Sequence, residues 1–235
     1  MQYPTISEYV KANQDASDNL DMSTEATNAE LLKEAITDEF GVEYSKDGRK
    51  LLKAPQKLDG TYSIKEGVRI ICNNAFSGCF SLKSLVIPDS VTRIGEGAFL
   101  WCSSLSEIVI PSSVTSIGHS AFYKCDSLRV VISDGVTSIG DHAFGGCRSL
   151  SEIVIPSSVT SIGDHAFGGC RSLSEIVIPS SVTSIGDNAF YGCDSLSEIV
   201  IPSSVTSIGD RAFYNCKFSD NLKQELISRF GDKIF

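Results

Sequence analysis

The sequence predicts a right-handed solenoid of about seven coils, β-rich within the α/β class, with parallel strands and helical caps at both ends. An Ala-Phe pair recurs seven times, and a cysteine stands three positions after each phenylalanine. The step between copies is 23 residues, with a single step of 22. A fixed period of this length marks a repeat architecture, in which each unit contacts only its neighbours. The phenylalanines of the pairs are Phe76, Phe99, Phe122, Phe144, Phe167, Phe190 and Phe213.

The first half of each unit predicts a strand. In residues 150–156 it reads L-x-x-I-x-I-P, and the first six positions are the strand signature of leucine-rich repeats. Ile153 and Ile155 point to one side of this strand, and Glu152 and Val154 point to the other, because side chains alternate along a strand. Pro156 ends the strand, since proline has no N–H to donate to a neighbour.

The second half of the unit predicts a return stretch and a turn. Val159 and Ile162 indicate a second short extended segment, and Gly163 is expected in a turn that requires a positive φ. The Ala-Phe pair and the cysteine then close the coil. One such unit cannot bury its own apolar face, so neighbouring units must stack and form internal columns of equivalent side chains.

Two units depart from the pattern. The first, about residues 57–79, has Tyr62 and Ile64 where the isoleucines stand, which fits a terminal capping unit. The unit that ends at Cys147 is one residue short, and Ser133-Asp134-Gly135 replaces its Pro-Ser-Ser.

The pattern L-x-x-I-x-I-P-x-x-V-x-x-I-G-x-x-A-F-x-x-C, over roughly residues 57–216, resembles the BspA-like leucine-rich-repeat family. The resemblance implies a leucine-rich-repeat solenoid, a bacterial source and a cell-surface or secreted location. It also implies adhesion to host matrix or cell-surface proteins, with no catalytic residues and no cofactor. This expected function is inferred by analogy of fold.

Four regions follow from these patterns. Residues 1–43 form an acidic helical segment or cap, 44–56 a hairpin that leads into the array, 57–216 the solenoid and 217–235 a C-terminal helical cap. Helices are expected over about 6–14 and 29–39, the second capped by Asn28 and ended by Gly41. A separate helical arm and partial disorder of 13–27 remain alternatives. The C-terminal helix should cover the last coil with Leu222, Leu226, Ile227 and Phe230.

Charge and hydropathy narrow the range of partners. Residues 1–43 hold ten acidic and two basic residues, so they carry −8 of the net charge of −9. This balance argues against nucleic acid and anionic membranes as partners. No apolar run approaches 18 residues, so no membrane span is expected. The first residues show no secretion signal, which leaves a cytoplasmic location open if the sequence is complete.

The eight cysteines are not expected to form disulfides. Stacked copies would have parallel Cβ directions, with a Cβ–Cβ separation too long for a bridge. Seven of them are therefore interpreted as buried free thiols. Cys72 lies off the column, where other units have glycine, and could be exposed.

The outward row of the main strands is the candidate binding surface. It would form an apolar stripe beside a row of like charges, and exposed apolar stripes often mark interaction sites. High strand propensity of valine and the solubility given by glutamate offer a purely structural explanation, which stays open. The candidate residues are Val86, Val109, Val154, Val177, Val200, Glu107, Glu152, Glu175 and Glu198.

Two smaller clusters are weaker candidates. His142 and His165 with Asp141 and Asp164 would be neighbours in successive coils, but duplicated turn residues explain them better than a metal site, so no metal is expected. Aromatic residues between the phenylalanine and the cysteine of a coil could form a glycan-binding edge, or could simply pack on the surface. They are Trp101, Tyr123, Tyr191 and Tyr214.

The sequence therefore predicts a non-enzymatic binding protein that recognises a protein ligand through the strand face. A cytoplasmic scaffold that docks through its acidic N-terminal region, and a carbohydrate-binding surface protein, are the alternatives. No nucleophile motif, phosphate loop or dinucleotide-binding glycine motif is present.

Overall fold

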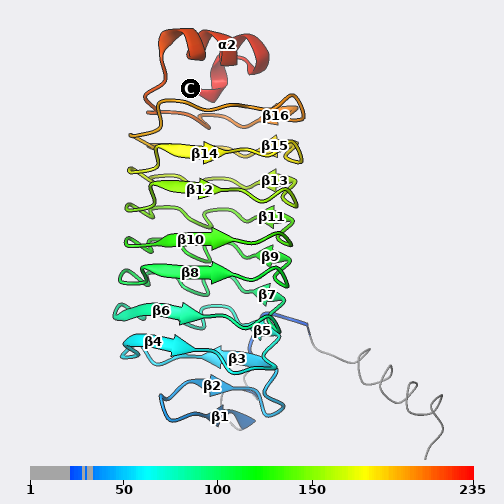
Figure 1. Cartoon of the computed structure of the whole chain (residues 1–235), viewed down its shortest axis with the longest axis vertical. Coiled ribbons are helices and arrows are strands. Elements are labelled where there is room, and N and C mark those ends of the chain that lie inside the picture. The colour runs from blue at the N-terminus through cyan, green and yellow to red at the C-terminus, as the bar shows by residue number, and fades with distance from the viewer. Residues whose placement is uncertain (1–21, 28–29, 31–33) are drawn as a thin grey trace, which may run out of the picture.

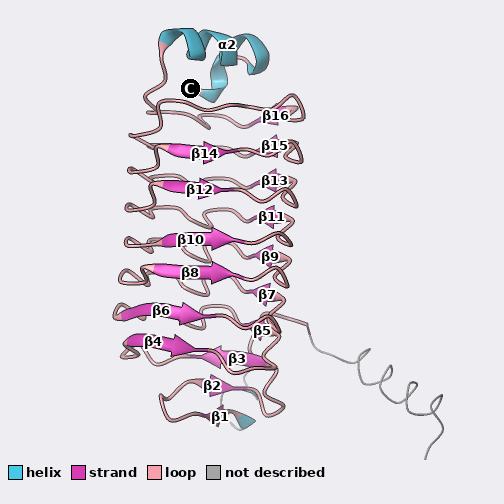
Figure 2. Ribbon diagram, viewed as in Figure 1, coloured by secondary structure: helices cyan, strands magenta, loops and turns pink. Residues whose placement is uncertain are grey.

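The computed structural model describes residues 22–27, 30 and 34–235, and it confirms the predicted solenoid. Two layers of short strands stack along one long axis, with the chain passing from one layer to the other in each coil (Figure 1). The cap helix α2 (Asp220–Phe230) covers one end of the stack, and strands β1 (Ile36–Thr37) and β2 (Glu43–Tyr44) lie at the opposite end (Figure 2).

The first layer, here called the narrow sheet, contains ten strands in the order β1-β2-β3-β5-β7-β9-β11-β13-β15-β16. From β3 onward, neighbouring strands of this sheet pair in parallel with equivalent residues in register, so that Ile162 of β13 lies beside Ile185 of β15. The isoleucines point inward and are buried, whereas the serines beside them face outward. Its strands are Ile36–Thr37, Glu43–Tyr44, Lys50–Lys53, Ile70–Ile71, Arg93–Ile94, Ser116–Ile117, Ser138–Ile139, Ser161–Ile162, Ser184–Ile185 and Ser207–Ile208.

The second layer, here called the strand face, holds the L-x-x-I-x-I segments, and its hydrogen bonding is interrupted. Strands β4, β6, β8 and β10 form one parallel sheet, whereas β12 and β14 form another. The break follows β10, which belongs to the shortened coil with Ser133-Asp134-Gly135. The repeat pattern did not predict this break. The strands are Gly60–Ser63, Leu82–Val86, Glu107–Ile110, Arg129–Ile132, Glu152–Val154 and Glu175–Val177.

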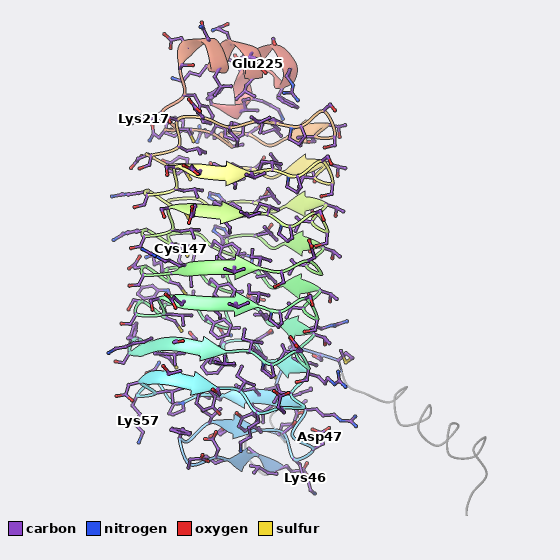
Figure 3. The ribbon with its side chains drawn as sticks, in the orientation of Figure 1. Lys46, Asp47, Lys57, Cys147, Lys217 and Glu225 are labelled. Atoms are coloured by element: carbon purple, nitrogen blue, oxygen red, sulfur yellow. The ribbon has the colours of Figure 1, made fainter. Side chains whose placement is uncertain are left out.

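Seven phenylalanines form a single column through the core, as the repeat spacing predicted. All seven are fully buried. Their rings stack with centroid separations of 5.0–5.6 Å and interplanar angles of 3–17°. Side chains fill the space between the two layers along the whole stack (Figure 3). The column extends to Tyr62 at one end and to Phe218 and Phe235 at the other.

All eight cysteines are free and buried, so the expected thiol column is confirmed. Six of the thiols donate a hydrogen bond to the carbonyl oxygen of the phenylalanine in the preceding coil, at 3.1–3.4 Å. The expectation that Cys72 could be exposed is wrong. Its side chain is 0% exposed because it packs with Leu52 and Ile70 under Met22 and Ala26 of the N-terminal segment.

Gly163 does not have the expected positive φ. The left-handed residue of the turn is His165, with a φ of 52°. Gly163 is required because a Cβ there would lie 2.4 Å from Oδ1 and 2.7 Å from the backbone nitrogen of Asp141 in the preceding coil. This close approach lets the Asp141 carboxylate accept a hydrogen bond from the backbone N–H of Asp164 at 2.9 Å. The same bond recurs in the next coils, where the backbone N–H of Asp187 donates to the Asp164 carboxylate and that of Asp210 donates to the Asp187 carboxylate.

The N-terminal cap differs from the expected helix over 29–39. Residues Ile36–Thr37 form strand β1, which pairs antiparallel with β2, and Gly41 has a φ of 83° in the turn between them. Strand β2 in turn pairs antiparallel with β3, which gives the hairpin expected around 44–56. Thr27 and Glu30 exchange the reciprocal hydrogen bonds of a capping box. The expected helix over 6–14 lies outside the described residues.

The C-terminal cap is the expected helix, α2, over Asp220–Phe230. Ser219 caps its N-terminus, and Leu226 is buried against the last coil, with Leu222 and Phe230 packed beside it. Glu225 of this helix is labelled in Figure 3 and is exposed. The short helix Asp232–Ile234 then brings the carbonyl groups of Lys233 and Ile234 to the backbone N–H groups of the last coil, at 2.7 and 2.8 Å. These residues take the place of a further coil.

Candidate functional site

A row of exposed valines runs along the strand face, as the alternation of side chains predicted. Each valine points outward because the buried apolar residues on either side of it point into the core. The exposed fractions of these valines range from 53% at Val86 to 81% at Val200. Val131 belongs to the same row and is 61% exposed, although it was not among the predicted residues. The row is therefore Val86, Val109, Val131, Val154, Val177 and Val200.

The predicted glutamates lie beside this row and are also exposed. Glu107, Glu152, Glu175 and Glu198 form no ion pair within the described part of the chain. Register places Glu152 directly beside Glu175, so like charges face each other across one strand spacing. Arg129 interrupts this acidic row, because it pairs in register with Glu107.

A groove of about 480 Å³ opens on the strand face where the sheet breaks between β10 and β12. Val109 and Val131 line it together with the charged side chains of Glu107, Arg129 and Glu152. The groove therefore combines exposed apolar surface with charges of both signs. The shortened unit, with its missing proline, is the sequence signal that coincides with this feature.

A second cavity, of about 600 Å³, lies between the last coil and helix α2. Aromatic side chains of Tyr214, Phe218 and Phe235 line it together with Lys223 and Asp220. Burial raises the pKa of the Cys216 thiol, which also borders this cavity, to about 12. The repeat pattern gave no signal for this cavity, because it depends on residues outside the repeats.

The histidines come together, but not in the arrangement of a metal site. The rings of His142 and His165 stack with centroids 4.6 Å apart and an interplanar angle of 5°. Parallel stacked rings direct their nitrogens side by side instead of toward one point. No cluster of three or more potential metal ligands occurs among the residues described. His119 adds a third ring, 5.3 Å from His142, and burial and both neighbouring histidines lower the pKa of His142.

The predicted aromatic edge divides into two groups. Tyr191 and Tyr214 stack on each other at 5.2 Å near the C-terminal end. Trp101 and Tyr123 lie in the second and third coils, where the ammonium of Lys124 contacts both rings. Between the two groups, successive coils have glycine at both positions, as in Gly145-Gly146.

Comparison with known families decides which class of repeat this is. A family model described as the BspA type leucine rich repeat region matches residues 60–134 and 129–235, with six copies. The chain belongs to this BspA-type family. Leucine-rich repeat proteins of this kind are generally non-enzymatic scaffolds that mediate protein interactions. No curated protein matches the chain.

Solved structures of bacterial leucine-rich repeat proteins share the fold of this BspA-type chain. One from Eubacterium ventriosum has 29% identity and a TM-score of 0.75 over 80% of this chain and 51% of its own. One from Bacteroides ovatus has 31% identity and a TM-score of 0.68 over 80% and 49%. The T. pallidum leucine rich repeat protein has 30% identity and a TM-score of 0.65 over 87% and 95%.

The BspA-type chain thus spans about half the length of the first two of these proteins. Among the residues described, no helix is long and apolar enough to cross a membrane.

Proposed function

We propose that this BspA-type repeat protein binds a protein ligand through its strand face, at the surface of a bacterial cell. The observation that carries the proposal is the row of six exposed valines. Contiguous exposed apolar surface costs free energy in water, and on soluble proteins it commonly marks an interaction site. The resemblance to this family implies a surface or secreted location, which would give such a site access to proteins outside the cell.

The charges beside the valines define the chemistry of the ligand. Four unpaired glutamates flank the apolar row, and three of them, Glu152, Glu175 and Glu198, follow one another in successive coils. A complementary ligand would present an apolar strip bordered by lysine or arginine. Charge complementarity of this kind sets specificity and association rate more than affinity. The groove at the sheet break, with Arg129 inside it, gives the ligand a fixed register along an otherwise repetitive surface.

Threonine is the sharpest substitution for testing the valine row. The variant with Val154→Thr, Val177→Thr and Val200→Thr keeps the β-branched shape and strand propensity but replaces one exposed methyl group of each valine with a hydroxyl. Binding to a panel of immobilised extracellular-matrix proteins is measured by surface plasmon resonance. We expect at least tenfold weaker binding, with an unchanged melting temperature.

A matched control carries three substitutions in neighbouring loops, Ser149→Thr, Ser172→Thr and Ser195→Thr, where all three serines are exposed. This variant should bind like the original protein. Equal loss of binding in both variants, or full binding by the valine variant, would refute recognition through the strand face. A companion variant with Glu152→Gln, Glu175→Gln and Glu198→Gln should weaken the salt dependence of binding.

A further inference from the structure

The position immediately before the repeat cysteine has an unusual backbone conformation. Its φ lies between 56° and 75° in all seven coils. Four coils place glycine there, which adopts this left-handed conformation without strain. Asn215 is also tolerant, because asparagine visits this region more readily than other residues. Trp101, with a φ of 64°, and Lys124, with a φ of 56°, are the two side chains that this conformation disfavours.

The two strained residues occupy successive coils and contact each other. The ammonium of Lys124 lies 4.7 Å from the centroid of the Trp101 ring and 5.6 Å from that of Tyr123. Within the described part of the chain, this ammonium forms no ion pair with a carboxylate. The Trp101 side chain remains 47% exposed. The chain thus holds an uncompensated cation on an accessible aromatic platform.

Surface packing alone does not account for this arrangement. Glycine at both positions would close the turn with less strain, as it does at Gly146 and Gly169. Residues held in disfavoured backbone regions cluster at functional sites. Here, two adjacent coils have Trp101 and Lys124 in place of the glycine. Tyr123 completes the platform, because its ring lies over Gly145, where a Cβ would come within 2.9 Å of Cδ2. The His142 ring, 6.0 Å from that of Tyr123, adds a polar group at its border.

We propose that Trp101, Tyr123 and Lys124 form a binding site for an acidic saccharide. The exposed indole ring and the half-buried phenol ring provide flat apolar surfaces for the C–H face of a sugar ring. The Lys124 ammonium, which rests on the rings in the free protein, pairs with a carboxylate or sulfate of the ligand in a charge-assisted contact. The site lies between the phenylalanine and cysteine positions of its coils, apart from the strand face. It therefore does not depend on the protein-binding function proposed above.

The test uses the full chain and two substitutions that restore the glycine of the repeat, Trp101→Gly and Lys124→Gly. Three fluorescent oligosaccharides serve as probes in an anisotropy titration: hyaluronan for a carboxylate, chondroitin sulfate for a sulfate and dextran as the neutral reference. We expect at least tenfold tighter binding of one acidic probe than of dextran. Either substitution should remove that difference, while the melting temperature stays equal or rises because the strain is relieved. Which acidic probe binds identifies the anionic group.

Tyr191→Ala is the matched control, because Tyr191 is an exposed aromatic of the same edge three coils further along. This variant should bind like the original chain, as should the valine variant of the strand face. Equal affinity for all three probes, or undiminished binding by Trp101→Gly and Lys124→Gly, would overturn the proposal. A lower melting temperature for Trp101→Gly with binding retained would show that the indole serves packing.

Discussion

The thiol of Cys170 donates a hydrogen bond to the carbonyl oxygen of Phe144 in the preceding coil, with Sγ and the oxygen 3.1 Å apart. That carbonyl oxygen also accepts the backbone N–H of Cys147 at 3.2 Å. Each interior phenylalanine carbonyl is thereby held by its own coil and by the next. The cysteine column thus links successive coils as well as filling space, which explains why the repeat uses cysteine where alanine would fit.

Cys170→Ala should lower the free energy of unfolding by about 1–2 kcal/mol, because it removes a buried sulfur and a hydrogen bond between coils. Guanidinium denaturation followed by circular dichroism measures the change. The exposed Ser149 provides a control, since Ser149→Ala should shift the free energy by less than about 0.5 kcal/mol. Equal stability of the two variants would mean that the thiol contributes nothing to stacking.

The cysteines should be unreactive in the folded protein. Burial raises the pKa of the Cys79 thiol to about 11 and that of Cys216 to about 12, so little thiolate exists at pH 8. A disulfide-exchange reagent should therefore modify the chain only after unfolding, and Cys216, which is 7% exposed, should react first. Reducing agent should leave the melting temperature unchanged because all eight cysteines are free. Rapid labelling of several thiols in the native state would contradict the buried column.

Phe167→Ala should lower the free energy of unfolding by about 3–5 kcal/mol, the usual range for truncation of a buried aromatic side chain. Phe167 stacks on Phe144 and Phe190 with centroid distances of 5.5 and 5.4 Å, so the cavity would open between two coils. Denaturant unfolding compares this variant with Val154→Ala, which removes exposed side-chain atoms from the same coil. A loss below about 1 kcal/mol for Phe167→Ala would be incompatible with an interior position.

The repeat period was sufficient to predict the core, because a column requires only that equivalent residues stack in register. It placed Phe167, Cys170 and Ile162 correctly inside and Val154 outside. The caps were harder, since they do not repeat. The helical pattern over 29–39 fails at Ile36 because this residue pairs with Tyr44 in a hairpin that extends the narrow sheet. Strand pairing there overrides local helical propensity.

The candidate surfaces likewise divide into features that the sequence predicted and features that it did not. The exposed valines follow from alternation along each strand, and the sequence alone predicted all of them except Val131. The groove beside Arg129 does not, because it arises where hydrogen bonding between β10 and β12 is lost. The strained conformation of Trp101 was not predicted either. The available signal was that Trp101 occupies the repeat position held by Gly146 and Gly169 in other coils.

Gly163→Ala tests why the repeat has glycine at this position in successive copies. The added Cβ would lie 2.4 Å from the Asp141 carboxylate and 2.7 Å from its backbone nitrogen, so the coils must separate locally. We expect a loss of about 1–3 kcal/mol in the free energy of unfolding. At Gly192, with a φ of 67°, the nearest atom to an added Cβ is 4.0 Å away. Gly192→Ala should therefore show only backbone strain, and a larger loss there than at Gly163 would refute the steric explanation.

Acid should destabilise the fold through the stacked histidines. Burial first, and then the charges of His165 and His119, lower the pKa of His142 below its usual value of 6.5. The unfolded chain consequently binds a proton at this residue more readily than the folded chain does. Stability that is fully present above pH 6.5 is therefore lost as the pH falls below 6.5 and through the lowered pKa of His142.

His142→Asn, which introduces the residue found at Asn188 two coils later, should remove part of this pH dependence. Denaturant unfolding at pH 7.5 and pH 5.5 measures it for both proteins. Asparagine tolerates the φ of 55° at this position, so the variant should be as stable as the original chain at pH 7.5. His165→Asn relieves the same repulsion from the other side and should act in the same direction. An identical loss of stability on acidification in all three proteins would assign the pH dependence to groups outside the stack.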